Sequence, residues 1–275
     1  TCFSPRGLLS GLVKIRDSDF RGIEAIPEYV KTHPGTGNRI AHVETILSDE
    51  PEPETRPSCG VDFNFDMIKH RLLGRYADVD TTITDLTNQL KKNPSNPALH
   101  YGLGLAYDRK FMHDNALFHL KKALSIKIFD PLILVELGRI YLEKGETLQA
   151  VNIFKSIESD PILGQMVKFY LGVAYLEMGN LEAAKNHFST IISQASEQYP
   201  KAYFHQANIF SKENNTGLSH YYLGLYYNET GGFKTARVHL TKALENLDTP
   251  DEIKTARSLL EKINKKIATE NNPKH

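Results

Sequence analysis

Eleven histidines and two cysteines are the side chains of this chain best suited to bind a metal ion or attack a substrate. An HExxH helix would place two imidazoles on one face and add a glutamate as general base for metal-assisted hydrolysis. No histidine in this sequence is followed by a glutamate, so that motif is absent. Cys2 and Cys59 form no CxxC or CxxxC motif, which argues against a cysteine metal site. They are either two free thiols or, in an oxidising compartment, a disulfide.

Five further histidines fall on predicted repeat helices, and none of these five has a second ligand four residues away. We therefore expect them to pack inside the fold or to face solvent. They are His100, His113, His119, His187 and His239.

Charge and hydropathy narrow the function classes. Lys plus Arg and Asp plus Glu number 33 each, so the net charge is zero and predicts no attraction to nucleic acid or anionic membranes. No apolar stretch reaches the roughly 20 residues that span a bilayer. The longest, from Pro131 to Leu142, contains Glu136 and Arg139 and predicts a core helix.

A Leu-Gly-x-x-Tyr pattern occurs four times, and each tyrosine is followed nine residues later by an alanine. The leucine and tyrosine would share one face of a first helix (helix A), while the glycine lets a second helix (helix B) approach closely at the alanine. The copies begin at Leu103, Leu137, Leu171 and Leu223, so the first three are 34 residues apart. This pattern resembles the tetratricopeptide repeat (TPR), whose helix pairs stack into a superhelical solenoid.

The pattern predicts an all-α fold with a TPR domain over residues 63–268, made of about four to five repeats and a capping helix. A degenerate first repeat is expected at 63–96, an extra helix at 199–210 and the capping helix at 251–267. Before the repeats, residues 1–48 predict short helices, and the proline- and acid-rich segment 49–62 predicts a linker. The tail 269–275 is expected to be disordered.

In TPR solenoids, four positions of each helix A line the concave groove. Most of these positions are apolar here, with one cation and without the clustered Lys and Asn that would grip a C-terminal carboxylate. The predicted groove residues are Tyr101, Leu105, Asp108, Val135, Arg139, Leu142, Met166, Phe169, Val173, Tyr221, Leu225 and Asn228. Such a groove suits an amphipathic helix or an extended apolar segment of a protein partner. Alternatively, the extra helix or the N-terminal segment of the same chain fills it.

The N-terminal segment carries a second resemblance. The start CFSPRG is followed by a predicted helix and then by a turn that contains Thr32, His33, Pro34 and Arg39. This combination resembles the C-terminal end of HExxH zinc metalloprotease domains of the beta-barrel assembly-enhancing protease type (metallopeptidase family forty-eight). Bacterial members continue directly into a TPR array. The resemblance implies that the catalytic helix and the zinc ligands lie before Thr1, so this chain alone should be inactive and bind no zinc.

The same resemblance gives His33 a role. In relatives, the histidine of this motif can lie over the zinc as an added ligand, which implies that His33 is a switch ligand and Arg39 a structural or substrate-edge residue. Alternatively, His33 and Pro34 only form a turn before the next helix. A single imidazole cannot hold zinc where structural sites use four ligands.

Three functions are compatible with the sequence, each with a protein or peptide as partner. The first is the TPR domain of a periplasmic or exported zinc metalloprotease, which recruits substrate or an outer-membrane assembly partner and regulates the peptidase. The alternative is a stand-alone TPR adaptor or scaffold with no enzymatic role. A third, an oligomerisation scaffold, would show itself by self-association.

Overall fold

The structure is a computed structural model that describes residues 9, 12–13, 40–41, 43–45 and 65–271. The chain divides into two compact units, Thr1–Asn64 and Phe65–His275. In the first unit the described residues are helical. The predictions for Cys2, Thr32, His33, Pro34, Arg39, Cys59 and the linker 49–62 lie outside the described residues.

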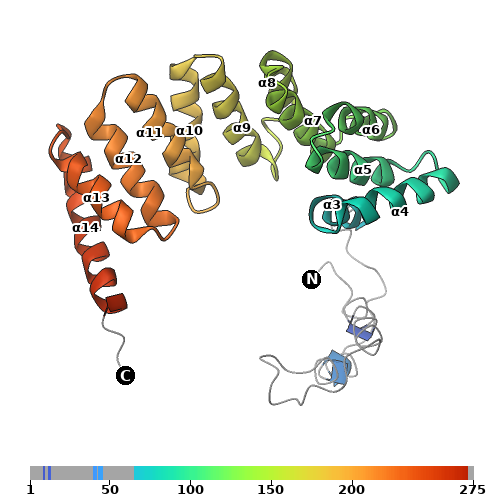
Figure 1. Cartoon of the computed structure of the whole chain (residues 1–275), viewed down its shortest axis with the longest axis horizontal. Helices are drawn as coiled ribbons and strands as arrows, with labels where there is room; N and C mark the ends of the chain where they lie inside the picture. Colours follow the sequence, from blue (N-terminus) through green and yellow to red (C-terminus); the bar gives the residue numbers. More distant parts are fainter. Residues whose placement is uncertain (1–8, 10–11, 14–39, 42, 46–64, 272–275) are drawn as a thin grey trace. The chain divides into compact units, whose positions relative to one another are not determined.

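The second unit is built from helices, and its described residues include no strand, which confirms the predicted all-α class (Figure 1). Among the described helices, none has both the length and the apolar character needed to cross a membrane. In chain order the helices are α3 (Phe65–Tyr76), α4 (Val79–Lys92), α5 (Pro97–Arg109), α6 (His113–Ile126), α7 (Pro131–Glu143), α8 (Thr147–Ser156), α9 (Gly164–Glu177), α10 (Leu181–Ala195), α11 (Lys201–Lys212), α12 (Thr216–Glu229), α13 (Phe233–Leu244) and α14 (Pro250–Asn271).

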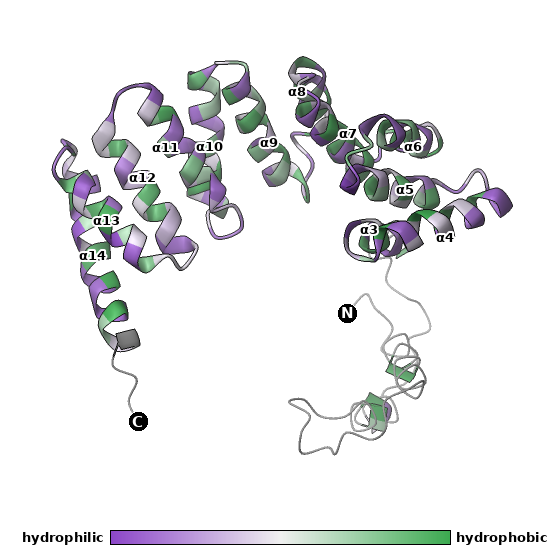
Figure 2. Cartoon of the chain, viewed as in Figure 1, coloured by the Kyte–Doolittle hydropathy of each residue, from purple (hydrophilic) through white to green (hydrophobic). Residues whose placement is uncertain are grey.

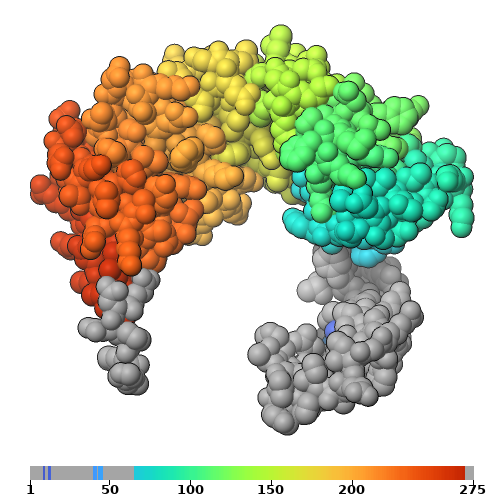
Figure 3. All heavy atoms as spheres, in the orientation of Figure 1, coloured from blue at the N-terminus to red at the C-terminus, as the bar shows by residue number. Residues whose placement is uncertain are grey.

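From α4 onward, each helix of this unit packs mainly against the helices next to it in sequence, as expected for stacked helix pairs, whereas α3 packs mainly against α5. The colours in Figure 3 accordingly follow the chain from α3 to α14. The segment 63–96, where the sequence predicts a degenerate repeat, contains α3 and α4; α11 lies at the predicted extra helix and α14 at the predicted capping helix. The last helix ends at Asn271, inside the segment 269–275 for which the sequence predicts a disordered tail, and residues 272–275 lie outside the described residues.

Polar caps fix several helix starts. Asn96 accepts a hydrogen bond from the backbone N–H of Ala98 at 2.8 Å, and Asp130 accepts one from Leu132 at 3.0 Å. Pro97 and Pro131 follow these caps, where a missing N–H costs nothing because helices leave their first donors unpaired. The two helices that begin here, α5 and α7, are the A helices of the first two clear repeats.

The turns between helix A and helix B require a left-handed backbone. Gly145, Gly179 and Gly231 have φ values of 76°, 75° and 80°, as predicted for the residues that end helix A. The turn between α5 and α6 carries Phe111 (φ 57°) instead, and the turn between the extra helix α11 and α12 carries Asn214 (φ 58°). Asparagine tolerates this conformation, whereas a bulky phenylalanine is strained by it.

The core lies between the helices, which alternate hydrophobic and hydrophilic residues around their circumference (Figure 2). The large residue that recurs in each helix B is fully buried at all four repeats: Leu120, Phe154, Phe188 and Leu240. The alanine four residues earlier is equally buried, which matches the repeat register read from the sequence.

Candidate functional site

Half of the predicted groove residues are buried in the second unit and present no contact surface to a partner. They are Tyr101, Leu105, Asp108, Val135, Leu142 and Tyr221. Neighbouring helices cover them: Met67 of α3 packs into the same cluster as Tyr101 and Leu105. Ile263 of α14 shares a cluster with Tyr221. These residues stabilise the stacking of the repeats.

The other half is partly exposed and comprises Arg139, Met166, Phe169, Val173, Leu225 and Asn228. Among them, Met166 and Phe169 line a pocket that has a volume of about 330 Å³. Its remaining walls are Tyr170 of α9 and the segment Gln198–Lys201 that leads into α11. We refer to this cavity as the α9–α11 pocket.

Aromatic rings build the back of the α9–α11 pocket. The ring of Phe169 stacks on Tyr199 with centroids 5.6 Å apart and meets His205 edge-on at 5.7 Å. Tyr170 stacks on the buried Phe154 at 5.5 Å. Since large rings in contact hold one another in place, the apolar walls are fixed before a partner arrives.

Burial also sets the charge of this pocket. It lowers the pKa of His205 to about 4, so this imidazole is uncharged at neutral pH. Burial raises the pKa of both Tyr170 and Tyr199, so these hydroxyls stay protonated. The exposed Lys201 is therefore the charged side chain among the residues that line the pocket.

Sequence reasoning missed Tyr199, Pro200 and Lys201 as pocket residues. They lie in the additional residues before the last repeat, where the 34-residue period is broken and assigns no position. The signal was available in the composition, because the Tyr-Pro-Lys run at the start of the predicted helix 199–210 is largely apolar, contains a rigid proline and carries one charge. The position of these residues also concerns the alternative that the extra helix fills the groove. The segment Gln198–Lys201 forms one wall of the α9–α11 pocket and does not fill the pocket.

The predicted groove cation, Arg139, is held inside the protein's own ion network. It donates hydrogen bonds to Asp108, to Glu136 and to Glu143, and Arg75 of α3 donates to Glu136. Burial disfavours ionisation of Glu136, but Arg75 and Arg139 outweigh it and lower the pKa of this carboxyl group. The network joins α3, α5 and α7, so Arg139 stabilises the repeat stack.

Two histidine pairs were also missed. The Nδ1 atoms of His100 and His119 are 2.9 Å apart, and those of His220 and His239 are 3.0 Å apart. Each pair joins helix A to helix B at the same repeat positions, 19 residues apart. A search for ligands four residues apart cannot find such pairs, but comparing the repeats position by position would have done so.

Comparison with known proteins agrees with this architecture. Residues 97–127 and 167–197 each match a family model described as tetratricopeptide repeat. No curated protein matches this sequence. A solved structure of PilW, described as a widely conserved type IV pilus biogenesis factor, is similar with a TM-score of 0.55 and 18% identity, covering 70% of this chain and 98% of that chain.

Two further solved structures are more distant. The chain named YrrB, described as a TPR protein with an unusual peptide-binding site, gives a TM-score of 0.46 at 16% identity, over 70% of this chain and 90% of that chain. MamA from Desulfovibrio magneticus RS-1 gives 0.49 at 16% identity, over 66% and 95%. At 18% identity, the similarity to PilW shows the fold alone. The unit from α3 to α14 contains tetratricopeptide repeats and folds as a TPR-type helical solenoid.

Proposed function

We propose that the α3–α14 unit is a protein-binding module that takes an apolar peptide segment into the α9–α11 pocket. The observation that supports this most is the coincidence of a pocket of about 330 Å³ with Met166 and Phe169, two of the residues that the repeat register assigns to the groove. Ligand pockets commonly begin at about 300 Å³, so this one accommodates one or two side chains of a peptide rather than a large ligand.

The lining indicates what the peptide should contain. Met166 is flexible and polarizable, and such side chains adapt to differently shaped apolar partners. Phe169 and Tyr199 offer a rigid aromatic wall. Lys201 at the start of α11 adds one positive charge. We therefore expect an aliphatic or aromatic anchor residue with an acidic residue close to it.

A second, larger pocket between α6, α7 and α8 fits a peptide less well. It has a volume of about 510 Å³, and charged residues contribute much of its lining. Lys144 in this pocket is 2.8 Å from Asp114 and 3.5 Å from Glu146, so its charge is already satisfied within the chain. A partner here would have to displace these ion pairs.

Binding to random peptides displayed on phage would test the proposal. Peptides selected on the wild-type chain should bind the purified protein in solution, and Met166→Lys should abolish this binding because it places a charge against apolar walls. Val238→Lys on α13 is the matched control, since Val238 is 50% exposed and does not line the pocket. If selected peptides bind Met166→Lys as tightly as the wild type, the pocket is not the binding site.

The wider context of this module divides into two proposals. A stand-alone adaptor or scaffold needs nothing beyond the solenoid. The metalloprotease context, with its zinc and its periplasmic or exported location, rests on the sequence resemblance around His33 and Arg39. Determining the natural reading frame upstream of Thr1 separates them: an HExxH motif with a downstream glutamate ligand would support the protease, and an unrelated domain would support the adaptor.

A further inference from the structure

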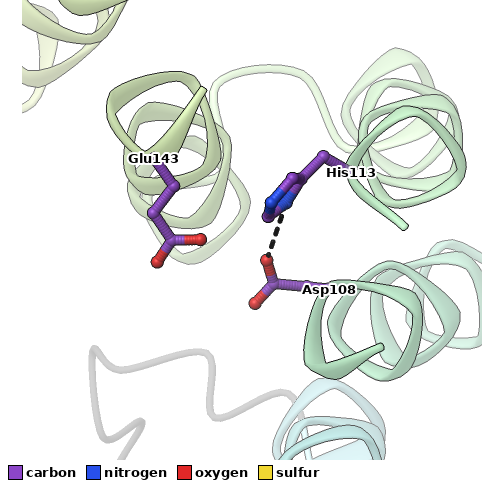
Figure 4. A group of neighbouring side chains, drawn as sticks. All are labelled: Asp108, His113 and Glu143. Carbon is purple, nitrogen blue, oxygen red and sulfur yellow. Dashed lines mark ion pairs between the residues drawn. The ribbon is translucent and has the colours of Figure 1, made fainter. Parts of the chain in front are cut away.

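Three potential metal ligands converge where the ends of α5 and α7 meet the start of α6 (Figure 4). Asp108 is in the last turn of α5, His113 is the first residue of α6, and Glu143 ends α7. One ligand atom from each of the three lies within 4.8 Å of the other two. Asp108 Oδ1 and His113 Nδ1 are 3.6 Å apart.

The hydrogen bonds around these residues leave one converging atom of Asp108 and one of His113 without a partner. Arg139 donates to Asp108 Oδ2 and to Glu143 Oε1, which holds one oxygen of each carboxylate. Asp108 Oδ1 and His113 Nδ1 are buried and have no hydrogen bond. The side chain of Asp108 is only 5% exposed, so its free oxygen cannot turn to bulk water. A buried carboxylate oxygen without a donor is costly and calls for a partner.

We propose that Asp108, His113 and Glu143 form a binding site for one divalent transition-metal ion, for which Zn²⁺ is the best match. Zinc accepts imidazole nitrogen and carboxylate oxygen in sites with three protein ligands and one open position. The imidazole selects against Ca²⁺ and Mg²⁺, which prefer oxygen ligands alone. Arg139 then orients the two carboxylates from outside the metal shell, as outer hydrogen-bond partners commonly do.

The geometry needs little adjustment to hold the ion. Tetrahedral zinc with bonds of about 2.0–2.2 Å separates its ligand atoms by roughly 3.4 Å. Asp108 and His113 are already close to that separation. Glu143 is the residue that must approach, and its side chain is 43% exposed, so there is room for its carboxylate to shift while Arg139 holds one of its oxygens. Asp108 and His113 lie on the two sides of the turn between α5 and α6, whereas Glu143 ends α7 of the next repeat. A bound ion would therefore link two repeats.

This site was not expected from the sequence, which assigned His113 to packing or surface because it has no ligand four residues away. The ligands come instead from three helices, and two of them, Asp108 and Glu143, are 35 residues apart, about one repeat length. The site does not involve the α9–α11 pocket, so it is independent of the proposed peptide binding.

Titration of the full, untagged chain with ZnCl₂, followed by calorimetry, tests the proposal. The wild type should bind one Zn²⁺ per chain at this site, and zinc should raise its melting temperature because it binds the folded state. His113→Gln and Glu143→Gln should each weaken this binding at least about tenfold, the lower end of what losing even an outer-shell partner costs. MgCl₂ in place of ZnCl₂ should give no heat of binding.

His187→Gln provides the matched control, because His187 lies 4.0 Å from Glu158 in a pair without a third ligand. This variant should bind zinc like the wild type. Circular dichroism would establish that each variant is folded, and Glu143→Gln keeps the test valid if His113→Gln unfolds. Absence of zinc binding, or binding that neither His113→Gln nor Glu143→Gln weakens, would overturn the proposal.

Discussion

The ring of Phe154 fills the space into which a side chain on Gly138 would project: a Cβ at Gly138 would lie 2.5 Å from Phe154 Cε1. Gly172 has the same relationship to Phe188, at 2.8 Å. The glycine of the repeat pattern therefore makes room for the large residue of helix B. The sequence had suggested the alanine of helix B as the point of closest approach, but the large residue lies four residues after that alanine. Helix A and helix B interlock through this pair.

Gly138→Ala should destabilise the protein, because the new methyl group meets the fully buried ring of Phe154. Overpacking of this kind costs about 1–3 kcal/mol in the free energy of unfolding, which chemical denaturation would measure. Asn152→Ala on the exposed side of α8 is the control and should change stability little. In a double-mutant cycle, Phe154→Leu should relieve part of the cost; independent, additive effects would contradict the proposed contact.

Phe111→Gly should stabilise the protein. Phe111 is in the left-handed region at φ 57° and is 83% exposed, so the ring contributes little buried area. The left-handed conformation costs an L-residue roughly 1–2 kcal/mol, and glycine removes this cost. Glycine also increases the conformational entropy of the unfolded chain, which offsets part of the stabilisation. We expect a net gain of up to about 1 kcal/mol in thermal or urea unfolding.

The equivalent turn in the next repeat gives the reverse test. Gly145 has φ 76° and no atom near its Cβ position, so Gly145→Ala alters only the backbone energy. It should destabilise the protein by about 1 kcal/mol. If Phe111→Gly destabilises while Gly145→Ala is neutral, backbone strain does not govern these turns.

The buried ion network should be sensitive to loss of one partner. Glu136 is 2% exposed and accepts hydrogen bonds from Arg75 and Arg139, so Glu136→Gln removes the buried carboxylate that these two guanidinium groups share and leaves Asp108 as their common counter-charge. Breaking a buried pair in this way costs about 3–5 kcal/mol. Asp114→Asn removes the exposed pair with Lys144 and should cost less than about 1 kcal/mol. Equal effects of the two variants would show that the network contributes no more than a surface pair.

Stability should fall on mild acidification because of the two histidine pairs. Burial lowers the pKa of His100, His119, His220 and His239, that of His119 to about 4. Unfolded histidine has a pKa of about 6.5, so between these values the unfolded chain binds more protons than the folded one. The stability that these uncharged histidines contribute is therefore fully present above about pH 6.5 and is lost as the pH falls towards 4.

Melting temperatures between pH 7 and pH 5 would measure this effect, since most carboxyl groups titrate below that range. The double variant His119→Gln and His239→Gln removes one imidazole from each pair. Its melting temperature should depend less steeply on pH than that of the wild type. Parallel curves would mean that the pairs do not carry the pH dependence.

The sequence predicted the solenoid better than it predicted the binding surface. Leu103 and Tyr107 fix helix A by local spacing alone, and such signals recur in each repeat. Burial of Tyr101 depends instead on α3, whose sequence lacks the repeat pattern but which packs closely enough that a Cβ on Gly74 would lie 2.6 Å from the carbonyl oxygen of Gly102. The pairing of Arg139 with Asp108 depends on how consecutive A helices stack, which no single repeat reveals.

Site-specific photo-crosslinking tests the central claim, that the α9–α11 pocket binds a peptide, most directly. A benzophenone amino acid would replace Gln198, an exposed residue that lines the pocket, and in a control protein Lys234 on α13. A phage-selected peptide should crosslink at position 198, not at 234, and the crosslink should disappear when Met166→Lys is added. Crosslinking at both positions alike, or none at 198 while the peptide is bound, would contradict the account.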